Sequence, residues 1–264
     1  MNEILIPILI LAALGLFFAL ILSFVNKKLA VPVDERAAKI EEALPGANCG
    51  GCGFASCSAY ASSLADGSAK IGQCRVAGAD AYAVISQVLG VEAPENAVPM
   101  KAFVACKGCI SGEEDKLRYS GVESCKAVTA FFGGKLKCTY GCTGYGDCVS
   151  ACTQNAISIV DGIAKVDPEL CSGCLVCVSV CPKGVIIPVH AESSVAVACN
   201  SHTKGSVTRA NCSAGCIGCK KCEKVCETGA VAVSGHLAKV DPDRCTHCEK
   251  CVEACPVGCI QFVC

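Results

Sequence analysis

The chain has 264 residues, of which 27 are cysteine and only 5% are aromatic, and it contains no tryptophan. Cysteine at this frequency indicates covalent or metal chemistry, and we expect the cysteines to replace part of the hydrophobic core. The net charge of −1 gives no electrostatic reason to expect a nucleic acid as a partner.

Two classes of protein carry cysteines this densely: secreted proteins held together by disulfides, and reduced proteins loaded with metal. The count of 27 is odd, which mildly disfavours complete internal pairing. The spacing of the cysteines therefore has to decide between the two classes.

The amino-terminal segment, residues 4–25, is an almost unbroken apolar run. As a helix it would be roughly 30 Å long, which is enough to cross a bilayer. Lys27 and Lys28 follow it directly, whereas only Glu3 is charged on its other side. The positive-inside rule then predicts a single-pass transmembrane anchor over residues 1–28 in the inner (cytoplasmic) membrane, with the rest of the chain on the cytoplasmic side. A cleaved signal peptide is the alternative, disfavoured because no basic residues precede the run.

The next segment, which we assign as an N-terminal [4Fe–4S] domain over residues 29–95, contains the motif Asn48-Cys-Gly-Gly-Cys-Gly-Phe-Ala-Ser-Cys. Its glycines remove side chains where the backbone must approach a ligand closely. A helix is expected from Ser58, and the stretch Val91 to Pro99 is typical of a linker. Three close thiolates and a distant one suit a [4Fe–4S] cluster; the alternative is a glycine-rich loop with buried free thiols. The predicted ligands are Cys49, Cys52, Cys57 and Cys74.

The second half of the chain is an internal repeat. When the sequence is shifted on itself so that Cys125 falls on Cys199, nine cysteines coincide without a gap. The matching pairs are Cys125 and Cys199, Cys138 and Cys212, Cys142 and Cys216, Cys148 and Cys222, Cys152 and Cys226, Cys171 and Cys245, Cys174 and Cys248, Cys177 and Cys251, and Cys181 and Cys255.

We therefore divide this half into two tandem ferredoxin-like modules, residues 96–190 and 191–264. Each contains a short alternating stretch, 156–160 and 230–233, which predicts a strand, and Leu175 to Val180 is typical of a helical turn. The predicted fold class is α+β, with a single N-terminal transmembrane helix, a small iron–sulfur domain and two modules that each hold two [4Fe–4S] clusters.

The cysteine motifs of the modules have the spacing C-x2-C-x2-C-x3-C, twice followed by proline. Three cysteines two residues apart wrap around one cluster, and the fourth reaches the other cluster of the pair. Thiolate is the soft ligand that iron–sulfur clusters need. A zinc site would use two C-x2-C pairs and stop at four ligands, so zinc is disfavoured.

This crossed pattern assigns four clusters to the modules. In the first module Tyr145 stands where the repeat has Cys219, so we take Cys138 as the substitute ligand. The predicted sets are Cys138, Cys142, Cys148 and Cys181; Cys152, Cys171, Cys174 and Cys177; Cys216, Cys219, Cys222 and Cys255; and Cys226, Cys245, Cys248 and Cys251.

Five clusters use 20 cysteines, which leaves 27 − 20 = 7. Because Cys125 and Cys199 match in the repeat, we expect them in equivalent positions of the two modules. A sixth cluster between the modules is the hypothesis; buried free thiols are the alternative, and Cys109 could replace Cys106. The predicted ligands of this sixth cluster are Cys106, Cys125, Cys199 and Cys212.

Other chemistry finds little support in the sequence. The four histidines are not paired at any ligand spacing, and His247 is expected to be a solvated loop residue. No phosphate-binding glycine loop follows a strand, so we expect no NAD or flavin site, and no nucleophile–base pair is evident. Lysines 220, 221 and 224 could bind an acidic electron carrier or simply be a solvated helix face.

Three motifs occur in the order Leu44-Pro-Gly-Ala-Asn-Cys-Gly-Gly-Cys-Gly, Tyr140-Gly-Cys-Thr-Gly-Tyr-Gly-Asp-Cys and Gly215-Cys-Ile-Gly-Cys-Lys-Lys-Cys. With them, essentially the whole chain resembles the RnfB family of the Rnf complexes, in the longer form with two ferredoxin-like modules. The absence of a proline after Cys152 and Cys226, and Tyr145 itself, depart from a plain ferredoxin pattern.

The resemblance implies an electron-transfer subunit of a membrane-bound ferredoxin:NAD oxidoreductase that translocates Na⁺ or H⁺. It implies soluble ferredoxin, the membrane and the other subunits of the complex as partners, with flavin and NAD bound elsewhere in the complex. It also implies that Cys49, Cys52, Cys57 and Cys74 hold a membrane-proximal cluster. The alternatives are an electron-wire subunit of another membrane redox complex, such as a hydrogenase, and an extracellular disulfide-stapled binding protein.

Overall fold

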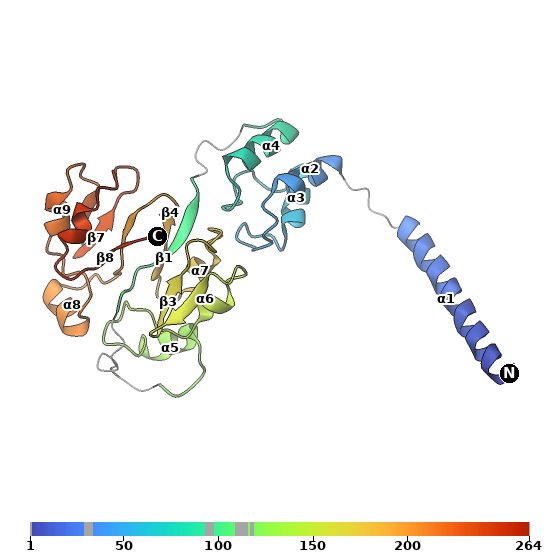
Figure 1. The fold of residues 1–264 in the computed structure, drawn as a ribbon, viewed down its shortest axis with the longest axis horizontal. Coiled ribbons are helices and arrows are strands. Elements are labelled where there is room, and N and C mark those ends of the chain that lie inside the picture. Colours follow the sequence, from blue (N-terminus) through green and yellow to red (C-terminus); the bar gives the residue numbers. More distant parts are fainter. Residues whose placement is uncertain (1, 29–33, 93–97, 109–115, 117–118, 264) are drawn as a thin grey trace.

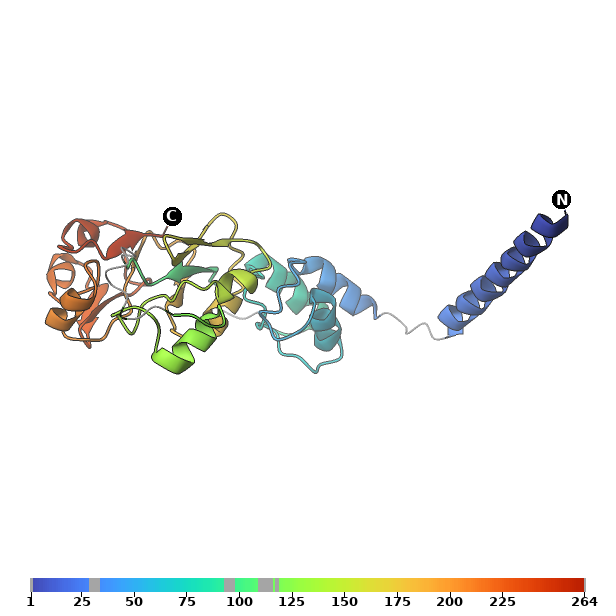
Figure 2. The same ribbon diagram turned by 90° about the horizontal axis from the view of Figure 1, so that it is seen from below.

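The computed structural model describes the chain except residues 1, 29–33, 93–97, 109–115, 117–118 and 264. The predicted linker therefore lies largely outside the described residues. Helix α1 stands apart, and the other parts follow one another in a row: a helical domain, a first module and a second module (Figures 1 and 2).

Helix α1 (Asn2–Lys28) contains the apolar amino-terminal run, and the side chains described within it are exposed. To cross a bilayer, a helix must present about 20 consecutive apolar residues. Among the residues that the structure describes, no helix satisfies both the length and the hydropathy that this requires. The prediction of a single N-terminal transmembrane helix is therefore corrected: the structure gives a helix here, and not a membrane span.

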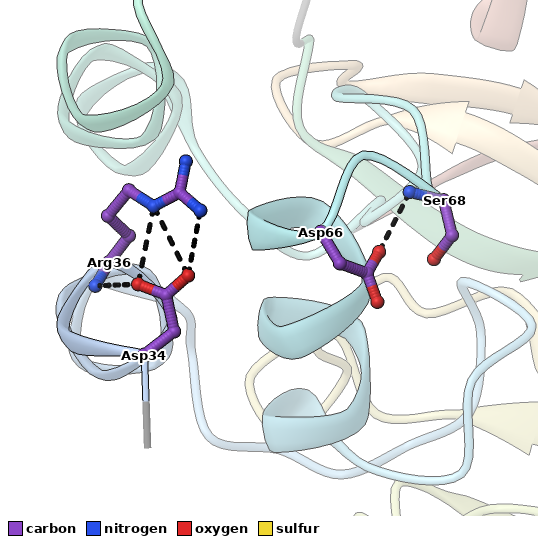
Figure 3. A network of polar contacts seen from close by, with 4 residues as sticks. All are labelled: Asp34, Arg36, Asp66 and Ser68. Atoms are coloured by element: carbon purple, nitrogen blue, oxygen red, sulfur yellow. Dashed lines mark hydrogen bonds and ion pairs between the residues drawn. The ribbon is translucent and has the colours of Figure 1, made fainter. Parts of the chain in front are cut away.

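The helical domain packs three helices, α2 (Glu35–Ala43), α3 (Cys57–Ala65) and α4 (Ala79–Leu89). Asp34 caps α2, because its carboxylate accepts the Arg36 backbone N–H at 2.9 Å and pairs with the Arg36 guanidinium at 2.8 Å (Figure 3). Asp66, after α3, accepts the Ser68 N–H at 2.8 Å in the same view. The predicted helix from Ser58 is confirmed and begins one residue earlier.

The first module has two antiparallel strand pairs. Its elements are β1 (Met100–Val104), α5 (Cys125–Phe132), α6 (Asp147–Ser150), β2 (Ile157–Val160), β3 (Ile163–Val166), α7 (Val176–Val180) and β4 (Ile186–His190). Strand β1 pairs with β4, and β2 pairs with β3 as a hairpin. The strand expected after the first motif and the helical turn expected after Leu175 are both confirmed.

The second module repeats this arrangement. Its elements are β5 (Val195–Val197), α8 (Gly205–Asn211), α9 (Lys221–Val225), β6 (Val231–Ser234), β7 (Leu237–Val240), α10 (Lys250–Glu253) and β8 (Ile260–Phe262). Strand β5 pairs with β8, and β6 pairs with β7. The two hairpins have the same register, because Ile157 faces Val166 and their repeat partners, Val231 and Val240, also face each other.

The cores of the parts differ in kind. The helical domain is built around large side chains such as Tyr60, Ile40 and Ile85. The cores of the modules contain cysteines among small aliphatic residues: Cys142, Cys148 and Cys177 in the first, and Cys216, Cys222, Cys251 and Cys259 in the second. The expectation that cysteine replaces part of the core is confirmed for the modules.

This difference predicts how the protein responds to iron removal. In the modules, metal binding supplies folding free energy, because the core cysteines are also the metal ligands. Chelation of iron should therefore abolish protection from hydrogen exchange in the hairpins of both modules while helices α3 and α4 keep more of theirs. Mass spectrometry of exchanged peptides measures this. Hairpins that stay fully protected in the chelated protein would contradict it.

Candidate iron–sulfur centres

Four cysteine loops share one backbone shape. In each, the residue before the second motif position has positive φ: Gly144, Gly173, Gly218 and His247. The residue after that position also has positive φ: Gly146, Leu175, Lys220 and Glu249. Left-handed backbone is costly for residues other than glycine and is found mainly where function needs it. The four loops are thus wound in the same way around a common centre.

His247 occupies a left-handed position that is glycine in the other three loops. Its ring Nδ1 lies 3.2 Å from the backbone N–H of Ser194 and 3.0 Å from the Ser194 hydroxyl, so the imidazole accepts the backbone proton. The interpretation of His247 as a loop residue is correct, but the ring anchors the loop to the start of β5 instead of being merely solvated.

Three of the predicted ligand sets in the modules come together in the structure. In each, burial raises the pKa of the central cysteine and the other three thiols raise it further. The pKa of Cys177 rises to about 11 beside Cys174, Cys171 and Cys152. The pKa of Cys222 rises to about 11 beside Cys216, Cys219 and Cys255. The pKa of Cys251 rises beside Cys245, Cys248 and Cys226. Each set has three cysteines from one loop and one from the other, as the crossed pattern predicts.

The helical domain brings its four cysteines together as well. Burial raises the pKa of Cys74, and the Cys52 and Cys57 thiols nearby contribute to the rise; the Cys74 thiol does the same for Cys49. The Asn48 side chain accepts the Cys57 backbone N–H at 2.8 Å, which closes the loop on the start of α3.

The remaining set of the first module differs from the sequence prediction. Burial raises the pKa of Cys148 to about 12, and the thiols that add to the rise are Cys142, Cys125 and Cys181. The same four cysteines line one cavity, and Cys138 is not part of its lining. The structure therefore places Cys125, and not Cys138, beside Cys142, Cys148 and Cys181.

Asp147 explains how Cys125 reaches this place. Its carboxylate accepts the backbone N–H groups of Cys125 at 2.9 Å and Lys126 at 3.1 Å, and the Ser124 hydroxyl at 3.0 Å. Burial opposes the charge, but these hydrogen bonds hold the pKa of Asp147 below its usual range. Asp147 directly precedes Cys148, so it joins the first residue of α5 to this ligand loop.

Cys138 lies instead at the junction of the two modules. It lines one cavity together with Cys106, Cys199 and Cys212. The expectation that Cys125 and Cys199 are equivalent is wrong, because Cys125 begins α5 whereas Cys199 follows β5. Cys106, which follows β1, is the structural counterpart of Cys199. Cys109 and Cys264 lie outside the described residues.

Cys259, to which the sequence assigned no role, is buried beside two predicted ligands. Its backbone N–H donates to the Cys255 sulfur at 3.3 Å, and the two sulfurs are 3.6 Å apart. Its thiol also donates to Cys216, which lowers the pKa of Cys216 to about 6. Its repeat-equivalent in the first module is Val185. Cys259 is therefore a hydrogen-bond donor to the sulfurs of one cluster site.

The helical domain touches the first module at a glycine. A methyl group added at Gly51 would lie 2.6 Å from the Cys174 carbonyl oxygen. Burial raises the pKa of the Cys49 thiol, the Gly51 N–H lowers it in part, and the Cys174 thiol raises it again. A ligand of the first site and a ligand of the next are thus in direct contact.

These groups fit iron–sulfur clusters. Within the described residues no disulfide joins any cysteines, and no three metal-binding side chains converge on a point that a single ion could occupy. Four thiols that surround a shared space, with backbone N–H groups directed at sulfur, are what a cluster of several iron atoms needs. Such clusters, once bound, store and release single electrons.

Comparison with known proteins agrees with this chemistry. A family described as "Putative Fe-S cluster" matches residues 44–76, and one described as "4Fe-4S dicluster domain" matches residues 137–185 and 215–259. The fold and the sites therefore define an iron–sulfur electron-transfer protein with ferredoxin-like modules.

Relatives over nearly the whole chain give the particular family, and each is the subunit designated B of its complex. The chain is 40% identical to that of the Na⁺-translocating ferredoxin:NAD⁺ oxidoreductase complex of Acetobacterium woodii, over 99% of this chain and 78% of that protein. It is 39% identical to that of the ion-translocating oxidoreductase complex of Methanosarcina acetivorans, over 93% and 94%. It is 36% identical to that of the proton-translocating ferredoxin:NAD⁺ oxidoreductase complex of Clostridium ljungdahlii, over 93% and 87%. The chain belongs to this family, the RnfB subunits of ion-translocating oxidoreductase (Rnf) complexes.

The place of Cys259 leads to a prediction. Cys259→Val keeps the backbone N–H but removes the thiol donor, so the iron content should not change while the reduction potential of one cluster becomes more negative, because hydrogen bonds to sulfur raise it. A redox titration followed by electron paramagnetic resonance measures the shift. Cys255→Ala is the control and should lose about four iron atoms. Loss of iron in Cys259→Val would mean that Cys259 is itself a ligand.

Proposed function

We propose that this chain is the electron-relay subunit of a membrane-associated ferredoxin:NAD⁺ oxidoreductase that translocates ions, and that it takes electrons from reduced ferredoxin. The observation that supports this most is the row of cysteine sites that runs through the helical domain and both modules. Five [4Fe–4S] clusters follow from the motifs, with a sixth at the junction of the modules.

The order of the sites along the row follows from contacts between ligands. The helical domain meets the first module where Gly51 packs against Cys174. The first module meets the second around Cys106 and Cys199, whose sulfurs accept the N–H groups of Cys142 at 3.4 Å and Cys216 at 3.2 Å. Neighbouring sites are therefore close enough for electrons to tunnel through the whole chain.

Electrons enter this row at the second module. Of the cysteines in the described part of the chain, Cys219 and Cys248 are exposed, and both belong to that module. Beside Cys219 the helix α9 carries Lys220, Lys221 and Lys224, of which Lys220 pairs with Glu223 at 3.8 Å. A partner with acidic groups around its own cluster would be attracted to this surface.

The cellular setting follows from the same chemistry. The relatives are named as subunits of ion-translocating complexes, which work in membranes. Cysteine ligands must remain reduced until the clusters are built, and the cytoplasm is the reducing compartment. The sites of this chain therefore face the cytoplasm, at the inner membrane, with the other subunits of the complex as partners.

The lysine surface gives a test of where ferredoxin binds. Lys221→Glu combined with Lys224→Glu should slow reduction by ferredoxin several-fold at low ionic strength, with a smaller effect in high salt, because electrostatic steering is screened. Stopped-flow bleaching of the visible absorbance measures the rate. Lys165→Glu combined with Lys239→Glu, on exposed strand positions, is the matched control. Equal rates for the two variants would place the ferredoxin site elsewhere.

Gly51 tests the connection at the other end. Gly51→Ala should leave the iron content unchanged but slow electron arrival at the helical domain several-fold, because the added methyl separates Cys49 from Cys174 and tunnelling falls steeply with distance. Gly78→Ala is the control, since a methyl there meets no atom within 4 Å. Rapid-freeze paramagnetic resonance after mixing with reduced ferredoxin follows this step. An unchanged rate in Gly51→Ala would show that electrons leave by another route.

A further inference from the structure

The two modules meet about an approximate twofold axis. The backbone N–H of Ala105 donates to Val185 at 2.7 Å, and that of Ala198 donates to Cys259 at 2.7 Å. Val185 and Cys259 match in the repeat. Ala105 and Ala198 thus hold equivalent places, and so do the cysteines that follow them, Cys106 and Cys199.

Contacts across the junction are reciprocal. The Lys107 ammonium donates to the Gly258 carbonyl of the second module at 3.0 Å, and the Asn200 amide donates to the Gly184 carbonyl of the first at 3.3 Å. Lys107 and Asn200 each follow one of the equivalent cysteines, and Gly184 and Gly258 match in the repeat. A two-sided contact of this kind is what symmetric pairing of two similar modules produces.

Four cysteines surround the space on this axis, two from each module. Cys106 and Cys199 are equivalent by their place after β1 and β5, and Cys138 and Cys212 match in the repeat. All four line one cavity. Thiols that only filled space would have no reason to obey the same symmetry as the backbone contacts.

Hydrogen bonds tie this set to the cluster sites on both sides. The Cys106 sulfur accepts the N–H of Cys142, and the Cys199 sulfur accepts the N–H of Cys216. Cys142 and Cys216 are themselves repeat partners and predicted ligands of the flanking clusters. The junction set therefore has one neighbouring cluster in each module, reached through equivalent hydrogen bonds.

The first module then needs another ligand, because Tyr145 replaces a cysteine. Cys125 is held next to Cys148 by the Asp147 carboxylate and shares a cavity with Cys142, Cys148 and Cys181. We propose that Cys106, Cys138, Cys199 and Cys212 bind a [4Fe–4S] cluster that bridges the modules, and that Cys125 completes the cluster of Cys142, Cys148 and Cys181. This assignment rests on the proposed cluster content and exchanges Cys125 with Cys138 relative to the sequence prediction.

Iron analysis of paired variants tests the assignment. Six clusters correspond to about 24 iron atoms, and Cys199→Ala should lower this to about 20. Adding Cys138→Ala should cause no further loss, because both ligands serve one cluster. Adding Cys125→Ala instead should lower the content to about 16, because a second cluster is lost. The opposite pattern for the two double variants would overturn the exchange, and no loss in Cys199→Ala would exclude the bridging cluster.

Alkylation of the single variant provides a readout that does not depend on the double variants folding. In iron-loaded Cys199→Ala, iodoacetamide should modify Cys138, which has lost its cluster, while Cys125 stays protected; in the unaltered protein both are protected. Mass spectrometry identifies the modified residue. Modification of Cys125 with protection of Cys138 would contradict the assignment. An unaltered protein without iron or visible absorbance would instead refute the proposed function itself.

Discussion

The structure depends on a single constraint: thiolates from distant parts of the chain must meet around shared spaces while backbone N–H groups point at their sulfurs. Four loops meet it with the same pair of left-handed residues, three times at the cost of a branched or charged side chain, as at Leu175, Lys220 and Glu249. Ligands are crossed between loops, so each loop is fixed only when both of its cluster sites are complete. Because the modules have few large core residues, the same contacts that bind iron also hold the fold.

Duplication then explains how isolated pairs of sites become a continuous row. Two similar modules packed about a twofold axis place equivalent loops against each other, and each module contributes the same two cysteines to the junction. The asymmetric changes are small and chemical. Tyr145 removes one ligand, Asp147 brings Cys125 in its place, and Cys259 adds a sulfur donor that Val185 lacks in the first module. The cluster environments differ for this reason, although the folds of the modules are alike.

The sequence predicted what spacing determines. The ferredoxin-like motifs, the crossed ligand sets of three clusters, the hairpin strands and the helix after Cys57 all follow from local patterns. It misassigned Cys125 and Cys138, because the repeat aligns Cys125 with Cys199 although the two lie in different elements. Only the Asp147 contact and the pairing of the modules, both long-range, reveal the exchange. The apolar amino-terminal run predicted a helix correctly, but the transmembrane assignment failed for the described residues because hydropathy alone was used to infer a span.

If the cluster sites form one ordered row, electrons that enter at the exposed end of the second module must pass through the first module before they reach the helical domain. Rapid-freeze paramagnetic resonance of the iron-loaded chain, after mixing with less than one equivalent of reduced ferredoxin, tests this most directly, with each cluster signal assigned beforehand from single ligand variants. We expect signals of the second module to appear first and the helical domain to respond last. Reduction of the helical domain before either module would contradict the ordered row.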